Sequence, residues 1–188
     1  MKTLLIRFFD VLFASTGIIL LLPIFAVLYC IGLCDTGSPI FRQTRLGKDL
    51  VPFTLIKFRT MGINTKSVAT HLANQNDVTT FGRFLRKSKL DELPQLWNVL
   101  KGDMSLVGPR PNLPTQDEII ESRNQLNVYR VRPGITGLAQ IQNIDMSNPQ
   151  LLARTDAEMI DNLSLKKYFR YILLTIFGKG HGDNITSK

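Results

Sequence analysis

A long uncharged stretch near the start of the chain constrains its fold more than any other feature. The 24 residues from Val11 to Cys34 carry no charge, and the stretch lies between Asp10 and Asp35. A run of this length can cross roughly 30 Å of hydrocarbon as a single helix. It is too long for the apolar part of a cleaved signal peptide, and Asp10 interrupts the basic lead-in that such a peptide has. The stretch therefore predicts a membrane-associated helix.

A proline near the middle of this stretch argues against a simple crossing. Pro23 removes a backbone hydrogen bond and divides the stretch into parts of 12 and 11 residues, each roughly 16 to 18 Å long and too short to span. Basic residues flank both ends, whereas a spanning helix usually has them on its cytoplasmic side. These residues are Lys2 and Arg7 before the stretch and Arg42, Arg45 and Lys48 after it. We therefore expect a re-entrant helix–break–helix within one leaflet, with a kinked single-pass anchor as the alternative.

Two charged residues stand where the re-entrant helix would enter the membrane. Arg7 and Asp10 are three positions apart, a spacing at which opposite charges can pair on a helix. We expect them to pair there and, with Pro23, to define a membrane element over residues 1–35 and a cytosolic domain over residues 36–188. The net charge of +8 favours an anionic partner, but it does not distinguish nucleic acid, a phospholipid surface and a phosphorylated substrate.

The cytosolic part is predicted to be mainly helical, with one short β-hairpin. Residues 40–44 and 51–58 read as extended segments on either side of a turn at residues 46–49. Residues 81–102 give the best helical pattern outside the membrane stretch. Residues 163–177 give another, which fits an interfacial helix or a helix packed in the core. The expected fold class is therefore α+β, with a re-entrant membrane helix and interfacial helices.

Two adjacent acids, Asp91 and Glu92, lie among several basic residues. Ser88 with Asp91 resembles a capping box, and Pro94 is tolerated only in the first turn of a helix, so both acids are expected in an opening turn. Charge runs of this kind are more often a solvated helix face. At a helix N-terminus among cations, however, a carboxylate stays ionised and can attack phosphorus, and its neighbour can hold Mg²⁺.

Two turns rich in glycine and proline each hold an arginine. Arg110 lies within residues 107–111, and Arg132 begins the turn of residues 132–137. A rigid turn fixes a guanidinium for phosphate binding at low entropy cost. Both turns are therefore candidates for contacts with a phosphorylated ligand.

The segment from Leu85 to Ser105, LRKSKLDELPQLWNVLKGDMS, resembles the bacterial sugar transferase family. These are the monotopic polyprenyl-phosphate phosphoglycosyl transferases that start glycoconjugate assembly. Three further segments resemble other motifs of the family in the same order, namely KFRTM at 57–61, GPRP at 108–111 and RPGITG at 132–137. The resemblance covers about residues 2–180, and the length is similar to the minimal form of the family.

This resemblance implies a reaction in two steps on a UDP-sugar. Asp91 would attack the β-phosphate and release UMP, and the phosphosugar would then pass from Asp91 to undecaprenyl or another polyprenyl phosphate. Glu92, together with Asp91, would bind Mg²⁺. The implied substrate-binding residues are Arg86, Lys57, Arg110 and Arg132, the last of which also fits a purely positional role.

The resemblance also implies a location and a set of partners. It places the protein on the cytoplasmic face of the bacterial inner membrane, with UDP-sugar, polyprenyl phosphate and inner-leaflet phospholipid as partners and no nucleic acid. The product would start an O-antigen, capsule, exopolysaccharide or glycoprotein glycan. The chain departs from the family at Leu22, before Pro23, where relatives often have a serine whose hydroxyl can stabilise the break.

Two other interpretations of the sequence stay open. A non-enzymatic basic module on the membrane would bind nucleic acid or anionic lipid, but the chain shows no recognisable nucleic-acid motif. A transferase of another type would move the sugar alone and release UDP. The released nucleotide distinguishes this last class from the leading hypothesis.

Overall fold

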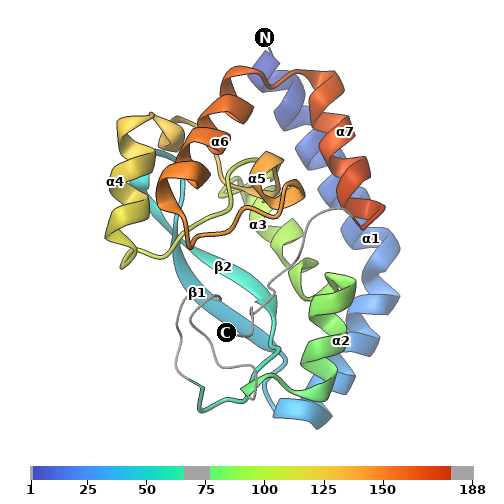
Figure 1. Ribbon diagram of the computed structural model, residues 1–188. Helices are drawn as coiled ribbons and strands as arrows, with labels where there is room; N and C mark the ends of the chain where they lie inside the picture. The colour runs from blue at the N-terminus through green and yellow to red at the C-terminus, as the bar shows by residue number, and fades with distance from the viewer. Residues whose placement is uncertain (1, 66–76, 179–188) are drawn as a thin grey trace.

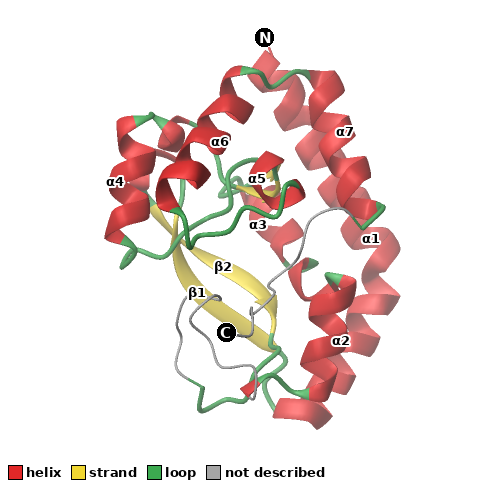
Figure 2. Ribbon diagram, viewed as in Figure 1, coloured by secondary structure: helices red, strands yellow, loops and turns green. Residues whose placement is uncertain are grey.

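The computed structural model describes residues 2–65 and 77–178. Helices make up most of this part of the chain, and two small sheets lie among them (Figure 2). The mainly helical α+β class predicted from the sequence is confirmed.

The first helix, α1 (Lys2–Thr36), is continuous and contains Pro23. The expected pair of helices separated by a break is therefore wrong, because the chain stays helical through the proline. Proline removes one N–H group and crowds the carbonyl of the preceding turn, which can bend a helix without ending it. In Figure 1, α1 descends from the N-terminus towards the right edge and then turns back towards the lower centre.

The hairpin is present as predicted. β1 (Ile40–Leu46) and β2 (Pro52–Phe58) pair antiparallel, and the connecting turn contains the short 3-10 helix η1 (Lys48–Leu50). Side chains alternate between the two faces of a strand, so Gln43 and Arg45 of β1 share one face, and both are buried. The hairpin thus presents a polar, buried face to the rest of the domain.

A second sheet joins the two glycine-rich turns. β3 (Ser105–Val107) and β4 (Gly134–Thr136) pair in parallel. A Cβ atom at Gly134 would lie 2.0 Å from the backbone nitrogen of Gly108, so only glycine permits this approach. The turn of residues 107–111, which carries Arg110, therefore lies against the turn of residues 132–137.

The remaining helices surround these strands. They are α2 (Thr80–Ser88), η4 (Leu90–Glu92), α3 (Gln95–Lys101), α4 (Asp117–Gln125), η5 (Val128–Arg130), α5 (Leu138–Ile141), α6 (Pro149–Asp161) and α7 (Leu165–Ile176). α4 packs against α6, and α7 lies beside the first half of α1 (Figure 1).

The hydrophobic core has two main parts, and α1 contributes to both. In the first, Ala14 of α1 packs with Val99, Met104 and Tyr168, and all four are fully buried. The second, which we call the hinge cluster, consists of Leu28 of α1, Phe58 and Leu85, with Phe25, Ile40, Phe81, Leu90 and Leu93 around them. Burying a large apolar side chain contributes about 1.5–3 kcal/mol, so α1 is part of the packed domain.

The opposite face of α1 is apolar and exposed. Ile19, Leu20 and Leu22 are 72%, 71% and 62% exposed, and α1 is long and apolar enough to cross a membrane. On α7, Tyr168 and Tyr171 are buried, while side chains near its end are exposed, so this helix both packs in the core and presents apolar groups. The exposed large apolar side chains outside α1 include Phe84, Trp97, Leu173, Ile176 and Phe177. An apolar surface of this extent is typical of a membrane-binding face.

Candidate active site

Asp91 and Glu92 lie in η4, a short turn that joins α2 to α3. The single helix predicted over residues 81–102 is wrong, because Lys89 adopts the left-handed conformation, with φ of 58°, and ends α2. Helices commonly end on such a residue. Gly102, the residue expected to end this helix, ends α3 and is also in the left-handed region of backbone conformation.

Ser88 does not cap the helix that follows it. Its hydroxyl donates to the carbonyl oxygens of Phe84 at 2.8 Å and Leu85 at 3.1 Å, in the last turn of α2. The predicted capping box is therefore wrong. The N-terminal cap of α2 is Thr79, whose side-chain oxygen accepts a hydrogen bond from Gly82 N at 2.8 Å.

Both acids are held in a buried position. Asp91 is 1% exposed and Glu92 is 8% exposed. The leucines on either side of them, Leu90 and Leu93, pack into the hinge cluster. Apolar anchoring on both sides fixes the turn, so the carboxylates cannot move freely as they would on a solvated helix face.

Cations lie next to this pair. Arg110 Nη2 donates to Glu92 Oε1 at 2.7 Å. Burial lowers the pKa of the Lys89 ammonium, with the charge of Glu92 acting against this shift and that of Arg110 adding to it. The three charged side chains are therefore close enough to influence one another, in a region shielded from water.

Arg86 and Lys57 lie on two elements, α2 and β2, that pack against η4. Arg86 Nε donates to Thr60 Oγ1 at 2.9 Å. A Cβ atom at Gly82 would lie 2.1 Å from Thr60 O, so glycine lets α2 pack closely enough for this bond. Lys57 is buried near the end of β2, which packs against η4, and its Nζ lies 5.8 Å from the centre of the Phe41 ring. That distance is within the range of a cation–π contact.

Arg132 lies at the other end of α3. Its Nε donates to Gly102 O at 2.7 Å, whereas Asp91 and Glu92 precede the N-terminal end of that helix. α3 has seven residues, so its ends are about 10 Å apart. The structure brings Arg110 to η4, and Arg86 and Lys57 lie on elements that pack against η4. Arg132 instead makes a contact that stabilises the C-terminal carbonyls of α3.

Arg7 of α1 makes a similar contact. Its Nη1 donates to Val99 O at 2.7 Å and its Nη2 to Leu100 O at 3.0 Å. Among the described residues Arg7 makes no direct ion pair with Asp10, contrary to the prediction, although its charge still acts on the Asp10 carboxyl. The reason is that the last carbonyls of a helix lack intrahelical partners, and the guanidinium satisfies them.

Asp10 is a buried junction between α1 and the rest of the domain. It is 1% exposed, and its Oδ1 accepts hydrogen bonds from Ser105 Oγ at 3.0 Å, Leu106 N at 2.9 Å and Tyr168 Oη at 2.8 Å. A buried carboxylate is costly without such partners. These bonds therefore explain why an acid occupies this position in an apolar helix.

Sequence reasoning missed a second buried ion pair. Arg123 of α4 and Asp156 of α6 are 1% and 0% exposed, and Arg123 Nη2 lies 2.6 Å from Asp156 Oδ2. A signal was present, since Asp156 occupies the same stripe of α6 as the buried residues Leu152 and Met159. An acid at a core position of an amphipathic helix indicates a buried cation opposite it.

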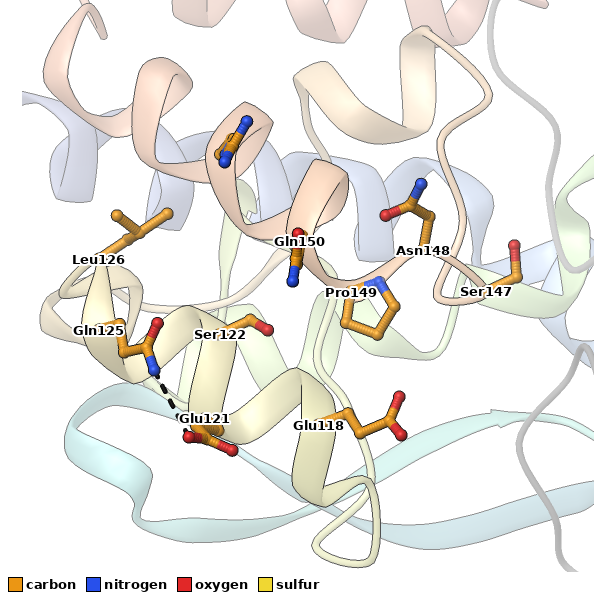
Figure 3. A pocket seen from close by; sticks show the side chains of 10 residues that line it. Glu118, Glu121, Ser122, Gln125, Leu126, Ser147, Asn148, Pro149 and Gln150 are labelled. Carbon is orange, nitrogen blue, oxygen red and sulfur yellow. Dashed lines mark hydrogen bonds between the residues drawn. The ribbon is translucent and has the colours of Figure 1, made fainter.

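A surface groove lies between α4 and α6, and none of the predicted site residues is among the residues that line it (Figure 3). Glu118 and Glu121 project from α4 on one side, and Asn148 and Gln150 lie on the other. The described lining residues are Glu118, Glu121, Ser122, Gln125, Leu126, Ser147, Asn148, Pro149, Gln150 and Arg154. With more acidic than basic groups, this lining does not suit a diphosphate.

Comparison with known proteins finds one family model and several relatives that match most of this chain. The family model described as bacterial sugar transferase matches residues 1–180. The uncharacterised sugar transferase EpsL of Bacillus subtilis is 40% identical over 177 residues, which cover 90% of this chain and 84% of that protein.

Two other relatives are named for their reactions. The UDP-glucose:undecaprenyl-phosphate glucose-1-phosphate transferase of Caulobacter vibrioides is 36% identical over 182 residues, covering 90% of this chain and 67% of that protein. The UDP-galactose-lipid carrier transferase of Erwinia amylovora is 35% identical over 188 residues, covering 90% of this chain and 39% of that protein. The chain thus spans less than half the length of the Erwinia relative.

Proposed function

The chain belongs to the bacterial sugar transferase family, and we propose that it transfers a sugar 1-phosphate from a UDP-sugar to undecaprenyl phosphate, releasing UMP. Relatives with this reaction in their names support the proposal. The lipid-linked product would be the starting unit of a glycoconjugate such as an O-antigen, capsule, exopolysaccharide or protein-linked glycan.

The buried carboxylate pair among cations is the observation that carries this proposal. Asp91 and Glu92 are both less than one-tenth exposed. Arg110 is bonded to Glu92, and Arg86 and Lys57 lie on α2 and β2, which pack against η4. A diphosphate brings negative charge that such cations can bind and, in the transition state, stabilise.

Asp91 is the proposed nucleophile. One of its carboxylate oxygens forms a bond to the β-phosphorus of the UDP-sugar, and the bond from that phosphorus to the bridging oxygen breaks, so UMP leaves. An oxygen of undecaprenyl phosphate then attacks the same phosphorus. The bond to Asp91 breaks, which restores the carboxylate and gives the diphosphate-linked sugar.

The residues present fit a magnesium ion at this site. Mg²⁺ is usually bound by one or two carboxylates together with substrate phosphates, and Asp91 and Glu92 are adjacent, buried carboxylates. The described residues hold no cluster of three or more His, Cys, Asp or Glu side chains, so the ion would depend on the substrate for further ligands. When bound, Mg²⁺ supplies positive charge that offsets the charge of the diphosphate.

The contacts of α1 support a re-entrant arrangement on the cytoplasmic face of the membrane. Arg7 and Asp35 are 28 positions apart, about 42 Å along a straight helix. Arg7 nevertheless contacts α3, and Asp35 Oδ2 accepts a hydrogen bond from Thr79 Oγ1 at 2.7 Å. Both ends of α1 therefore meet the same domain, whereas a straight spanning helix would place one end on the far side.

A labelling experiment tests this topology. The two native cysteines are replaced by serine, and Thr3→Cys or Ser38→Cys is introduced singly. In sealed spheroplasts, a membrane-impermeant thiol reagent should label both variants only after permeabilisation. Labelling of one variant before permeabilisation would favour the kinked single-pass anchor.

The released nucleotide tests the reaction itself. The purified protein in nanodiscs is incubated with Mg²⁺ and a panel of UDP-sugars, with and without undecaprenyl phosphate. We expect about one UMP per protein without the lipid and continuous UMP release with it. Release of UDP would assign the chain to another class of transferase.

A further inference from the structure

The loop of residues 108–113 carries Arg110, and side-chain and backbone groups of other elements hold it by hydrogen bonds to its carbonyl oxygens. Arg45 Nη1 donates to Pro111 O at 3.1 Å, and Leu46 N donates to Asn112 O at 3.0 Å. Both donors come from β1. The hairpin therefore fixes the second half of the loop, beyond the residue whose guanidinium reaches Glu92.

Arg123 holds the loop at Arg110 itself. Its Nη1 donates to Arg110 O at 2.8 Å and to Asn112 Oδ1 at 3.0 Å. Tyr129 Oη donates to the same Asn112 oxygen at 2.9 Å. The Nε and Nη2 atoms of Arg123 donate to Asp156 Oδ2 at 3.0 and 2.6 Å. One guanidinium thus connects the carboxylate of α6 to the backbone of Arg110.

Stability alone is a poor explanation for this arrangement. Removing two charges from water costs several kcal/mol per ion, and apolar residues can often replace a buried ion pair without loss of stability. Arg123 and Asp156 are 1% and 0% exposed. The planar guanidinium serves a carboxylate, a carbonyl and an amide oxygen from three separate nitrogen atoms, whereas lysine has a single donor nitrogen and an apolar side chain has none.

We propose that Arg123 is a positioning residue that, oriented by Asp156, fixes the backbone at Arg110 so that the Arg110 guanidinium meets Glu92 and the substrate diphosphate. The inference rests on the proposed function, in which Arg110 contacts the diphosphate. Arg123 is 1% exposed and does not line the site, so it acts only through Arg110.

The substitution Arg123→Lys tests this role. Lysine keeps a positive charge opposite Asp156 but has one donor nitrogen in place of the three that Arg123 uses, so the bonds to Arg110 O and Asn112 Oδ1 should weaken or be lost. We expect kcat/KM for UMP release to fall about tenfold to a hundredfold, the size of effect that small misplacements in an active site produce. Hydrogen exchange measured by mass spectrometry should become faster in peptides covering residues 108–113.

A second ion pair to α6 provides the control. Arg130 of η5, close to α4 in the chain, pairs with Asp161 of α6, but these side chains are 48% and 64% exposed. Arg130→Lys should leave both the activity and the exchange of the loop unchanged. Tyr129→Phe removes one hydrogen bond to Asn112, so it should change kcat/KM and loop exchange in the same direction as Arg123→Lys. It replaces Arg123→Lys as the test if the Arg123→Lys protein fails to fold.

A double-mutant cycle separates positioning from general support of the fold. In an Arg110→Ala background, Arg123→Lys should cause little further loss of kcat/KM. An equal loss in both backgrounds, or unchanged exchange in the loop, would overturn the inference. A wild-type protein that releases no UMP would instead refute the proposed function, and loop exchange alone would then decide whether Arg123 holds the loop.

Discussion

Replacing Asp10 with alanine removes the carboxylate that joins α1 to β3 and α7. Its Oδ1 atom accepts hydrogen bonds from Ser105 Oγ, Leu106 N and Tyr168 Oη at 3.0, 2.9 and 2.8 Å. Alanine would leave three buried donors without this acceptor, and each such group costs about 1–3 kcal/mol. Because neighbouring groups relax, we expect a loss of about 3–6 kcal/mol, a large part of the roughly 5–15 kcal/mol that stabilises a typical domain.

Two further variants test whether the loss of unfolding free energy arises from the hydrogen bonds at Asp10. All three hydrogen bonds end on Oδ1, which Asp10→Asn retains, so that change should cost only about 1–2 kcal/mol for the lost charge. Asp35→Ala removes the acid near the other end of α1, whose bond to Thr79 is exposed. Its effect should stay within about 0.5 kcal/mol, as for most surface substitutions.

Thermal unfolding in detergent, followed by circular dichroism, measures these losses. For a chain of this size, 1 kcal/mol shifts Tm by roughly 2–4 °C. We therefore expect Asp10→Ala to lower Tm by about 10 °C or more, Asp10→Asn by about 5 °C and Asp35→Ala by less than about 2 °C. A Tm for Asp10→Ala as high as that of the control would refute the assignment of Asp10 as the junction.

Three other substitutions give separate tests. Asp91→Asn should lower UMP release by more than about a thousandfold with unchanged circular dichroism, and near-normal turnover would remove Asp91 as nucleophile. Gly82→Ala would place a Cβ atom 2.1 Å from Thr60 O, so it should cost about 1–3 kcal/mol and lower turnover. A normal Tm and normal activity would show that α2 can shift to make room for the added Cβ atom. Arg132→Ala should lower Tm through the lost bond to Gly102 O and leave KM for the UDP-sugar unchanged. A raised KM with normal Tm would indicate a substrate contact instead.

The turn containing Asp91 shows how far the apolar pattern of the sequence could predict the fold. Leu90 and Leu93 follow helical spacing and do pack on one side, in the hinge cluster. The helix is nevertheless interrupted, because Lys89 has φ of 58° and the following turn is of the 3-10 type. The spacing of side chains across such a turn is close to that of an α-helix, so periodicity alone does not reveal the interruption.

The candidate site could be predicted as far as its residues lie in recognisable motifs. Glu92 and Arg110 belong to two such motifs, and the structure brings them into contact. Arg123 and Asp156 are 33 positions apart, and Asp10 and Tyr168 are 158 positions apart. No local pattern joins residues so distant. Only the presence of an acid among apolar neighbours marked Asp10 and Asp156 as unusual.

The packing of α1 into both hydrophobic cores has a consequence for how the protein is assembled. α1 precedes every element that it packs against, and one of its buried partners, Tyr168, lies near the other end of the described chain. During synthesis, lipid can cover the apolar outer face of α1 long before α7 exists. The inner face, with Ala14 and Leu28, would then serve as a template on which the later elements condense. Insertion of α1 into a membrane would thus be a step in folding this domain, and a chain shortened to begin after α1 should expose both cores and aggregate.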